Sequence, residues 1–141
     1  MHGDYRIDNT LLQLGTDALG DHARVSAIVD WELSTIGDPV ADVAMMAVYR
    51  DPIFDLVLGE PTAWTSTRIP DVAGLASSYE QGGGVPLRDF DQHLALGYFK
   101  LAVIAAGIDH RYRSGAAHGD GFDTAGDAVA PLLEAGSRLL P

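Results

Sequence analysis

The chain has 141 residues, no cysteine and a formal net charge of −11 at pH 7. This length fits one domain, and a hydrophobic content of 47% is enough for a core. The acidic balance argues against nucleic acid and against an anionic membrane surface, since both are bound by clustered Lys and Arg. The missing cysteines exclude disulfides and thiolate sites, and the first residues do not resemble a signal peptide, so we expect a cytoplasmic protein.

The first predicted element is a short β-hairpin. Turn-forming residues fill positions 2–10, which we expect to form a loop. Two short apolar runs, at 11–14 and 25–29, flank a polar segment at 15–24. Brief strands joined by such a turn are typical of a hairpin. The second run ends directly at Asp30.

A buried helix is predicted next. Asp38 followed by Pro39 is a helix-start signal, because proline is favoured in the first helical turn after a capping residue. Apolar residues then recur at spacings of three and four: Val40, Val43, Ala44, Ala47 and Val48. The following segment, 51–70, lacks clear periodicity and is predicted to be a loop or short irregular turns.

Three more helices are predicted in the second half. Asp71 should cap a modest helix that ends near residue 81. The clearest helix covers 89–113, where a second apolar stripe beside the first predicts burial on most sides: Leu96, Phe99, Val103 and Ile104. The last helix covers roughly 123–139, and Pro131 should kink or restart it.

The residues that carry chemistry lie at the two ends of the predicted hairpin. Asp4 and Asn9 are five positions apart in the first loop, and Asp30 follows the second strand. Phosphoryl transfer needs one carboxylate to accept or orient the proton of the attacking hydroxyl. It also needs hard oxygen ligands, such as an amide and a second carboxylate, for magnesium on the nucleotide phosphates. The order and spacing of these three residues match the kinase pattern.

These segments resemble the aminoglycoside phosphotransferase family, whose catalytic loop reads His-Gly-Asp-x-x-x-x-Asn. The resemblance is closest to the branch whose phosphotransferase domain is fused to long acyl-CoA dehydrogenases, and it covers essentially the whole chain. The helical part is supportive only. The specific segments are His2-Gly3-Asp4 with Asn9, then Asp30-Trp31-Glu32, Gly37-Asp38-Pro39 and Asp42.

The resemblance implies the C-terminal lobe of a protein-kinase-like fold. This α+β, mainly helical lobe would hold the catalytic loop, a short hairpin and about four helices over residues 1–141. Carried over by position, Asp4 would be the catalytic base and His2 would buttress its loop. Asn9 and Asp30 would bind Mg²⁺ and, through it, ATP or another nucleoside triphosphate.

Two further aspartates of the resembling segments receive structural roles. Asp38 and Asp42 would anchor loop backbone rather than touch substrate. The acceptor would be the hydroxyl of a small molecule. Both a hydroxyacyl-CoA-like metabolite and a cationic aminoglycoside remain open, with the first preferred.

The family pattern also requires a nucleotide-binding lobe before the catalytic loop, and only Met1 precedes His2 here. The single lysine, Lys100, comes after the catalytic segment. We therefore expect this chain to be inactive by itself, whether Met1 is internal to a longer protein or the chain is a truncated product. The rival hypothesis is a non-catalytic remnant or interaction module. In either case the face left by the missing lobe would be apolar and prone to self-association.

A second His-Gly-Asp tripeptide, His118-Gly119-Asp120, provides a control for the first. Position 125 is Ala rather than Asn, and no apolar strand ending in Asp follows. We interpret this copy as a loop. Trp31 and Trp64 are both expected in the core.

Overall fold

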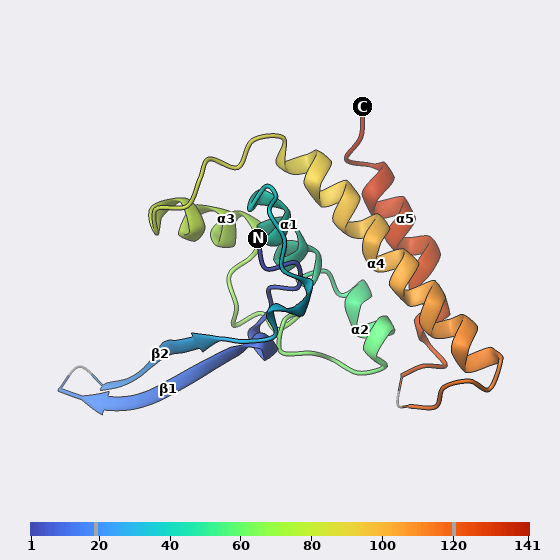
Figure 1. Ribbon diagram of the computed structural model, residues 1–141, viewed down its shortest axis with the longest axis horizontal. Coiled ribbons are helices and arrows are strands. Elements are labelled where there is room, and N and C mark those ends of the chain that lie inside the picture. Colours follow the sequence, from blue (N-terminus) through green and yellow to red (C-terminus); the bar gives the residue numbers. More distant parts are fainter. Residues whose placement is uncertain (19, 120) are drawn as a thin grey trace.

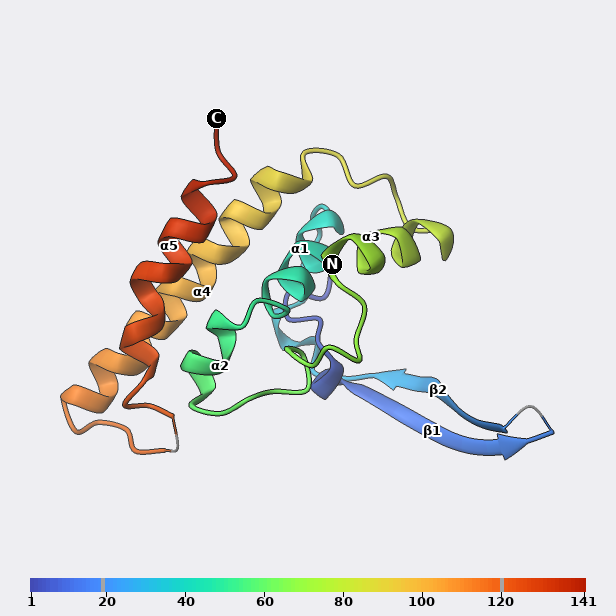
Figure 2. The same ribbon diagram turned by 180° about the vertical axis from the view of Figure 1, so that it is seen from behind.

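Figure 1 shows the computed structural model, which describes residues 1–18, 20–119 and 121–141. A two-stranded hairpin projects from one side of a helical body. The N-terminus lies beside α1 and α3 of this body in both Figure 1 and Figure 2. The chain is therefore α+β with helix predominating, as the sequence predicts.

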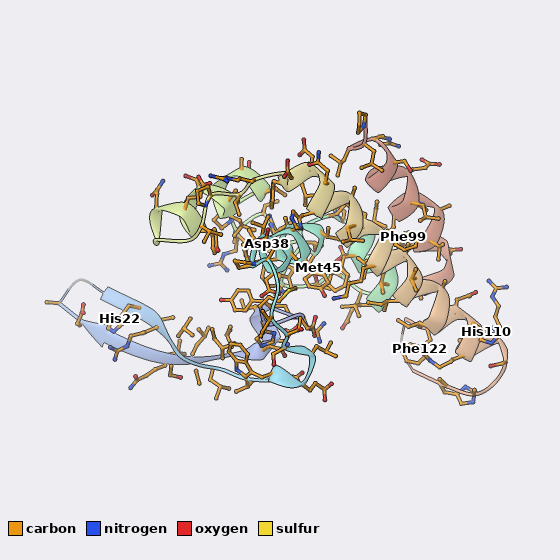
Figure 3. All side chains as sticks on the ribbon, turned by 45° about the horizontal axis from the view of Figure 1, so that its top comes forward. His22, Asp38, Met45, Phe99, His110 and Phe122 are labelled. Carbon is orange, nitrogen blue, oxygen red and sulfur yellow. The ribbon has the colours of Figure 1, made fainter. Side chains whose placement is uncertain are left out.

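The hairpin consists of β1 (Thr10–Asp17) and β2 (Gly20–Ile28), which pair antiparallel with a bulge between Leu11 and Leu12. Its existence confirms the prediction, but both strands extend far into the segment predicted as a turn. No described residue of either strand is buried. Backbone pairing therefore continues through polar residues that carry no burial pattern, and periodicity could not reveal it. Figure 3 shows His22 on this exposed arm, far from Met45 in the helical body.

Short 3₁₀ turns flank the hairpin on both sides, η1 (Ile7–Asn9) before it and η2 (Trp31–Leu33) after it. The amide of Val29 donates to the carbonyl oxygen of Asn9 at 2.9 Å. This bond extends the pairing of Thr10 with Ile28 by one step. The two turns therefore leave the same end of the hairpin and enter the helical body together.

Five α-helices lie in the described part of the chain, one more than predicted. They are α1 (Val40–Val48), α2 (Ile53–Leu58), α3 (Val72–Gln81), α4 (Phe90–Arg113) and α5 (Val129–Ser137), the last preceded by the 3₁₀ turn η3 (Ala125–Ala128). The predictions for α1, α3 and α4 are confirmed. Asp71 caps α3 as expected, since its side chain accepts from the amide of Gly74 at 2.8 Å.

The prediction that 51–70 forms a loop or short irregular turns is wrong for the residues of α2. The Asp51 carboxylate accepts from the amide of Ile53 at 2.9 Å and starts the helix, and Gly59 ends it in the left-handed conformation. Phe54 and Val57 are its buried residues. Six residues give only one such pair at a helical spacing, which is too few for periodicity to be seen.

The final helix is confirmed in two parts. The turn η3 ends at Ala128, and α5 restarts at Val129. Pro131 is the third residue of α5, where the missing amide hydrogen has no partner to lose within the helix. The proline thus fixes where the regular helix can begin.

The core forms where α4 packs between α1 and α5. Helix α5 runs alongside α4 in Figures 1 and 2. Gly97 on α4 permits this approach, since a Cβ there would lie 3.0 Å from Cγ2 of Val48. Trp64 is buried as predicted. The main buried residues of the three helices are Ala44, Met45, Ala47, Val48, Leu94, Leu101, Ala102, Ala105 and Leu132.

Two burial predictions are wrong. The second stripe of α4 is open, with exposed fractions of 62% for Leu96, 54% for Phe99 and 56% for Val103. Neighbours cover one side of α4 only, so an all-round apolar helix here marks a free face rather than a deeper core. Trp31 is likewise half-exposed, although its indole nitrogen donates to the carbonyl of Ile28 at 2.8 Å. None of the described helices is long and apolar enough to cross a membrane.

Adjacent leucines on α5 allow the core to be tested. Leu132 is fully buried and Leu133 is 41% exposed. Leu132→Ala should lower the free energy of unfolding by ~2–5 kcal/mol, because it removes buried methyl groups and leaves a cavity. Leu133→Ala should cost less than about 1 kcal/mol. Urea unfolding followed by circular dichroism compares the two, and equal losses would contradict the packing described here.

Candidate active site

The N-terminal loop, residues 2–9, is fixed to the first turn of α1 by Asp42. The two carboxylate oxygens of Asp42 accept hydrogen bonds from the backbone amides of His2 at 2.5 Å and Gly3 at 2.8 Å. The predicted anchoring role of Asp42 is confirmed. Gly3 has a φ of 89°, and a Cβ there would collide with the carbonyl oxygen of Leu33, so only glycine fits this turn.

The imidazole of His2 joins the loop to the end of β2. The side chain is buried, and Nε2 lies 2.8 Å from the carbonyl oxygen of Val29. Nδ1 accepts from the amide of Asp4 at 3.3 Å, which assigns the ring hydrogen to Nε2 as donor to Val29. The ring also packs on Trp31, with centroids 4.7 Å apart. His2 therefore occupies a position suited to the buttressing role that remains predicted for it.

Lys100 reaches the loop from α4. Its Nζ donates to the carbonyl oxygen of Gly3 at 2.9 Å. Together with Asp42, it fixes both polar groups of the Gly3 backbone. Nothing in the sequence separates this lysine from a surface lysine, because the contact spans 97 positions.

The Asp4 carboxylate is held on both oxygens. Oδ1 accepts from the Tyr49 hydroxyl at 3.0 Å. Oδ2 lies 3.5 Å from the side-chain nitrogen Nδ2 of Asn9 and 3.6 Å from Nε of Arg6. The Asp4 side chain is 24% exposed, so one side remains open to a reactant. Its orientation is nevertheless set by its neighbours.

Tyr49 was missed by the sequence reasoning, although one signal was present. Asp42 and Tyr49 are seven residues apart, which is two helical turns, and so share one face of α1. Burial raises the pKa of the Tyr49 phenol well above its usual range, and the nearby Asp4 charge raises it further. The hydroxyl therefore stays protonated and acts as a donor near neutral pH.

Asn9 and Asp30 lie at the same end of the hairpin, one before β1 and one after β2. The side chain of Asn9 is buried, and its Nδ2 donates to the carbonyl oxygen of Asp4 at 2.8 Å. The amide oxygen is thus the atom available for a metal. Asp30 is exposed and adopts the left-handed conformation at φ 63°. That conformation is uncommon for a residue other than glycine and is often found at functional sites.

A magnesium ion fits the chemistry of this donor set. Among residues 1–18, 20–119 and 121–141, no group of three His, Cys, Asp or Glu side chains could hold a metal by itself. Magnesium in kinases needs only one or two protein oxygens, because substrate phosphates and waters complete its shell. An amide oxygen from Asn9 and a carboxylate oxygen from Asp30 meet that need. Their assignment as metal ligands stays a prediction.

The remaining acidic and histidine segments differ from this site. Asp38 accepts from the amide of Val40 at 2.9 Å, as expected of a backbone anchor. His118 and Gly119 lie in the connection between α4 and η3, while Asp120 of the second tripeptide lies outside the described residues.

The two anchoring aspartates can be compared directly. Asp42→Ala removes two half-buried hydrogen bonds and should lower the free energy of unfolding by ~3 kcal/mol. Asp38→Ala removes one at a side chain that is 56% exposed and should cost about 0.5–1.5 kcal/mol. Chemical denaturation measures both. An Asp42→Ala loss no larger than that of Asp38→Ala would show that the loop does not depend on Asp42.

Comparison with known proteins agrees with this geometry. The model of the family described as "Phosphotransferase enzyme family" (APH) matches residues 1–91. The chain is 34% identical to acyl-CoA dehydrogenase family member 11 of Homo sapiens and 35% identical to that of Gallus gallus, over 99% of this chain in each case. It covers 17% and 18% of those proteins, so it spans less than a fifth of their length.

A plant relative, "Probable acyl-CoA dehydrogenase IBR3" of Arabidopsis thaliana, is 29% identical over 82% of this chain and 14% of its own length. No solved structure matches the chain significantly. The branch inferred from the sequence is thus confirmed by relatives named as acyl-CoA dehydrogenases. The chain belongs to the phosphotransferase enzyme family.

Proposed function

We propose that this chain forms the acceptor side of an ATP-dependent small-molecule O-phosphotransferase. The observation that carries this proposal is the Asp4 carboxylate, partly open to solvent and fixed by Tyr49 within a loop that Asp42 anchors. An acceptor hydroxyl would donate its proton to Asp4. The oxygen of the acceptor would then form a bond to the γ-phosphorus, while the bond between that phosphorus and the leaving nucleoside diphosphate breaks.

Asn9 and Asp30 would hold magnesium on the nucleotide. When bound, the ion would offset negative charge on the phosphates. The buried side-chain amide of Asn9 is already oriented by its hydrogen bond to the Asp4 backbone. Metal binding by Asn9 and proton acceptance by Asp4 would therefore be linked within one loop. A nucleotide-binding lobe joined to this chain would supply the remaining phosphate contacts.

The acceptor we favour is a hydroxyacyl-CoA-like metabolite rather than an aminoglycoside. A cavity of about 350 Å³ lies beside the loop and is lined mainly by apolar and aromatic side chains, among them Tyr5, Trp31, Met46 and Tyr79. Such a lining suits an acyl chain and offers little to a polycation. The relatives named as acyl-CoA dehydrogenases agree with this choice. The net charge of −11 would favour a cationic acceptor and so supports the alternative acceptor, an aminoglycoside.

The role of Asp4 can be tested in a protein in which a nucleotide-binding lobe is joined to this chain. Asp4→Asn should reduce kcat by ~10²–10⁴-fold, the usual contribution of a general base. It should preserve the fold, because Asn can still accept from Tyr49. Asp8→Asn is the matched control, an exposed aspartate of the same loop, and should keep its activity. Phosphorylation of a panel of hydroxyl acceptors measures both, and near-normal kcat in Asp4→Asn would remove Asp4 from the mechanism.

The 141-residue chain alone should not transfer phosphate. The phosphates need cationic and backbone contacts, and its one lysine, Lys100, is engaged with Gly3. We also expect self-association through apolar residues beside the loop, since Trp31, Leu33 and Ile36 are exposed. Calorimetry with magnesium and ATP, alongside size-exclusion chromatography, tests both expectations. Micromolar binding with phosphorylation of an acceptor would contradict the first, and a monomeric elution volume would contradict the second.

If the protein with a nucleotide-binding lobe joined also fails to transfer phosphate to any acceptor, the chain is better explained as a non-catalytic interaction module. The same panel therefore separates the two functions. We place the enzyme in the cytoplasm, in keeping with a chain free of cysteine.

A further inference from the structure

Tyr49 is a buried side chain whose hydroxyl contacts the N-terminal loop. It is the C-terminal cap of α1 and is only 4% exposed. Its ring packs against Phe54 of α2, with centroids 4.8 Å apart, and against Trp64 at 6.3 Å. Contacts with these two aromatic rings restrict the phenol to one orientation. The hydroxyl is therefore presented from a rigid part of the core.

This hydroxyl makes the shortest hydrogen bond to the Asp4 carboxylate among the described side chains. The Tyr49 oxygen is 3.0 Å from Oδ1, whereas Asn9 and Arg6 lie 3.5 and 3.6 Å from Oδ2. Hydrogen-bond energy falls off over that range of distance, so the bond from Tyr49 contributes most to the orientation of the carboxylate. Asn9 and Arg6 constrain the second oxygen more weakly.

The bond does not prevent Asp4 from acting on a substrate. An ionised carboxylate can accept at about four lone-pair positions, so Oδ1 retains one after Tyr49 has donated. Tyr49 itself is too buried to be the phosphorylated group. A donor from the protein interior thus leaves the open side of the carboxylate to an acceptor hydroxyl.

We propose that Tyr49 is a positioning residue for phosphoryl transfer, holding the Asp4 carboxylate so that its free lone pairs face the acceptor hydroxyl. This inference rests on the proposed function, because it takes Asp4 as the base. Tyr49 acts through Asp4 and touches neither acceptor nor nucleotide. Asp42 and Tyr49 share one face of α1. Asp42 holds the backbone of the loop, and Tyr49 holds the side chain of Asp4.

A matched control is available within the same fold. The Tyr98 hydroxyl donates to Oδ2 of Asp51 at 2.8 Å, and burial raises the pKa of this phenol as it does that of Tyr49. Tyr98 lies on α4 and its partner lies in the turn before α2, outside the candidate active site. Tyr49→Phe and Tyr98→Phe therefore each remove one part-buried tyrosine–aspartate hydrogen bond, although Tyr98 itself is less buried than Tyr49.

The test uses the phosphotransferase with its nucleotide-binding lobe joined. Tyr49→Phe should lower kcat by ~10–100-fold, since a small misplacement of a catalytic group has effects of this size. The KM values for acceptor and ATP should change less than about threefold, because Tyr49 contacts neither. Tyr98→Phe should retain kcat. Both variants should show similar decreases in thermal midpoint.

A double variant shows whether Tyr49 acts through Asp4. In the Asp4→Asn background, adding Tyr49→Phe should cause no further loss of kcat, since the group that it positions is already gone. A further loss of the same size as in the wild-type background would overturn the proposal. So would normal kcat in Tyr49→Phe, a change in KM alone, or unfolding of Tyr49→Phe but not of Tyr98→Phe. Retained activity in Asp4→Asn would instead refute the proposed function itself.

Discussion

The carboxylate of Asp42 is the constraint on which the candidate site depends. The loop from His2 to Asn9 has regular structure only in its last three residues, so its conformation must come from contacts with other elements. Ordering a backbone costs ~1–2 kcal/mol per residue, while each hydrogen bond to a charged group returns about 1.5–3 kcal/mol. Two bonds to Asp42 offset the ordering of only a few residues. The bonds made by the His2 ring, Lys100 and Asn9 are therefore also required for the rest of the loop.

Most of these contacts originate from helices whose own positions are fixed by burial. Helix α1 has six buried residues among nine, and its packing on α4 fixes where Asp42 and Tyr49 point. Helix α4 contributes Lys100 from the border between its buried and open sides. The apolar core thus determines the site indirectly. Side-chain burial orients the helices, the helices hold the loop, and the loop presents Asp4 between Tyr49 and solvent.

The fold was predictable where burial leaves a periodic trace. Helix α1, where all buried residues except Met45 belong to the predicted pattern, and the long helix α4 were placed correctly from their patterns. The short α2 and the exposed ends of the hairpin left no such trace. Periodicity also failed to distinguish a buried stripe from the open stripe at Leu96 and Phe99, because an apolar residue does not reveal whether a neighbour covers it. The contact between Asp4 and Tyr49 spans 45 positions, which no local spacing encodes.

Tyr49 couples the stability of the fold to the chemistry proposed for it. A buried hydroxyl must have a hydrogen-bond partner, since leaving it unsatisfied costs ~1–3 kcal/mol. The partly buried Tyr98 bonds to Asp51, a residue away from the site, whereas the buried Tyr49 bonds to Asp4, the carboxylate proposed as the base. Truncating Asp4 to alanine would therefore remove the proposed base and also leave a core donor without its partner. Asparagine at this position keeps the acceptor and removes only the charge and the basicity. The carboxylate thus has one role as hydrogen-bond partner of the core and a separable, proposed role as base, and the first fixes the geometry in which the second would operate.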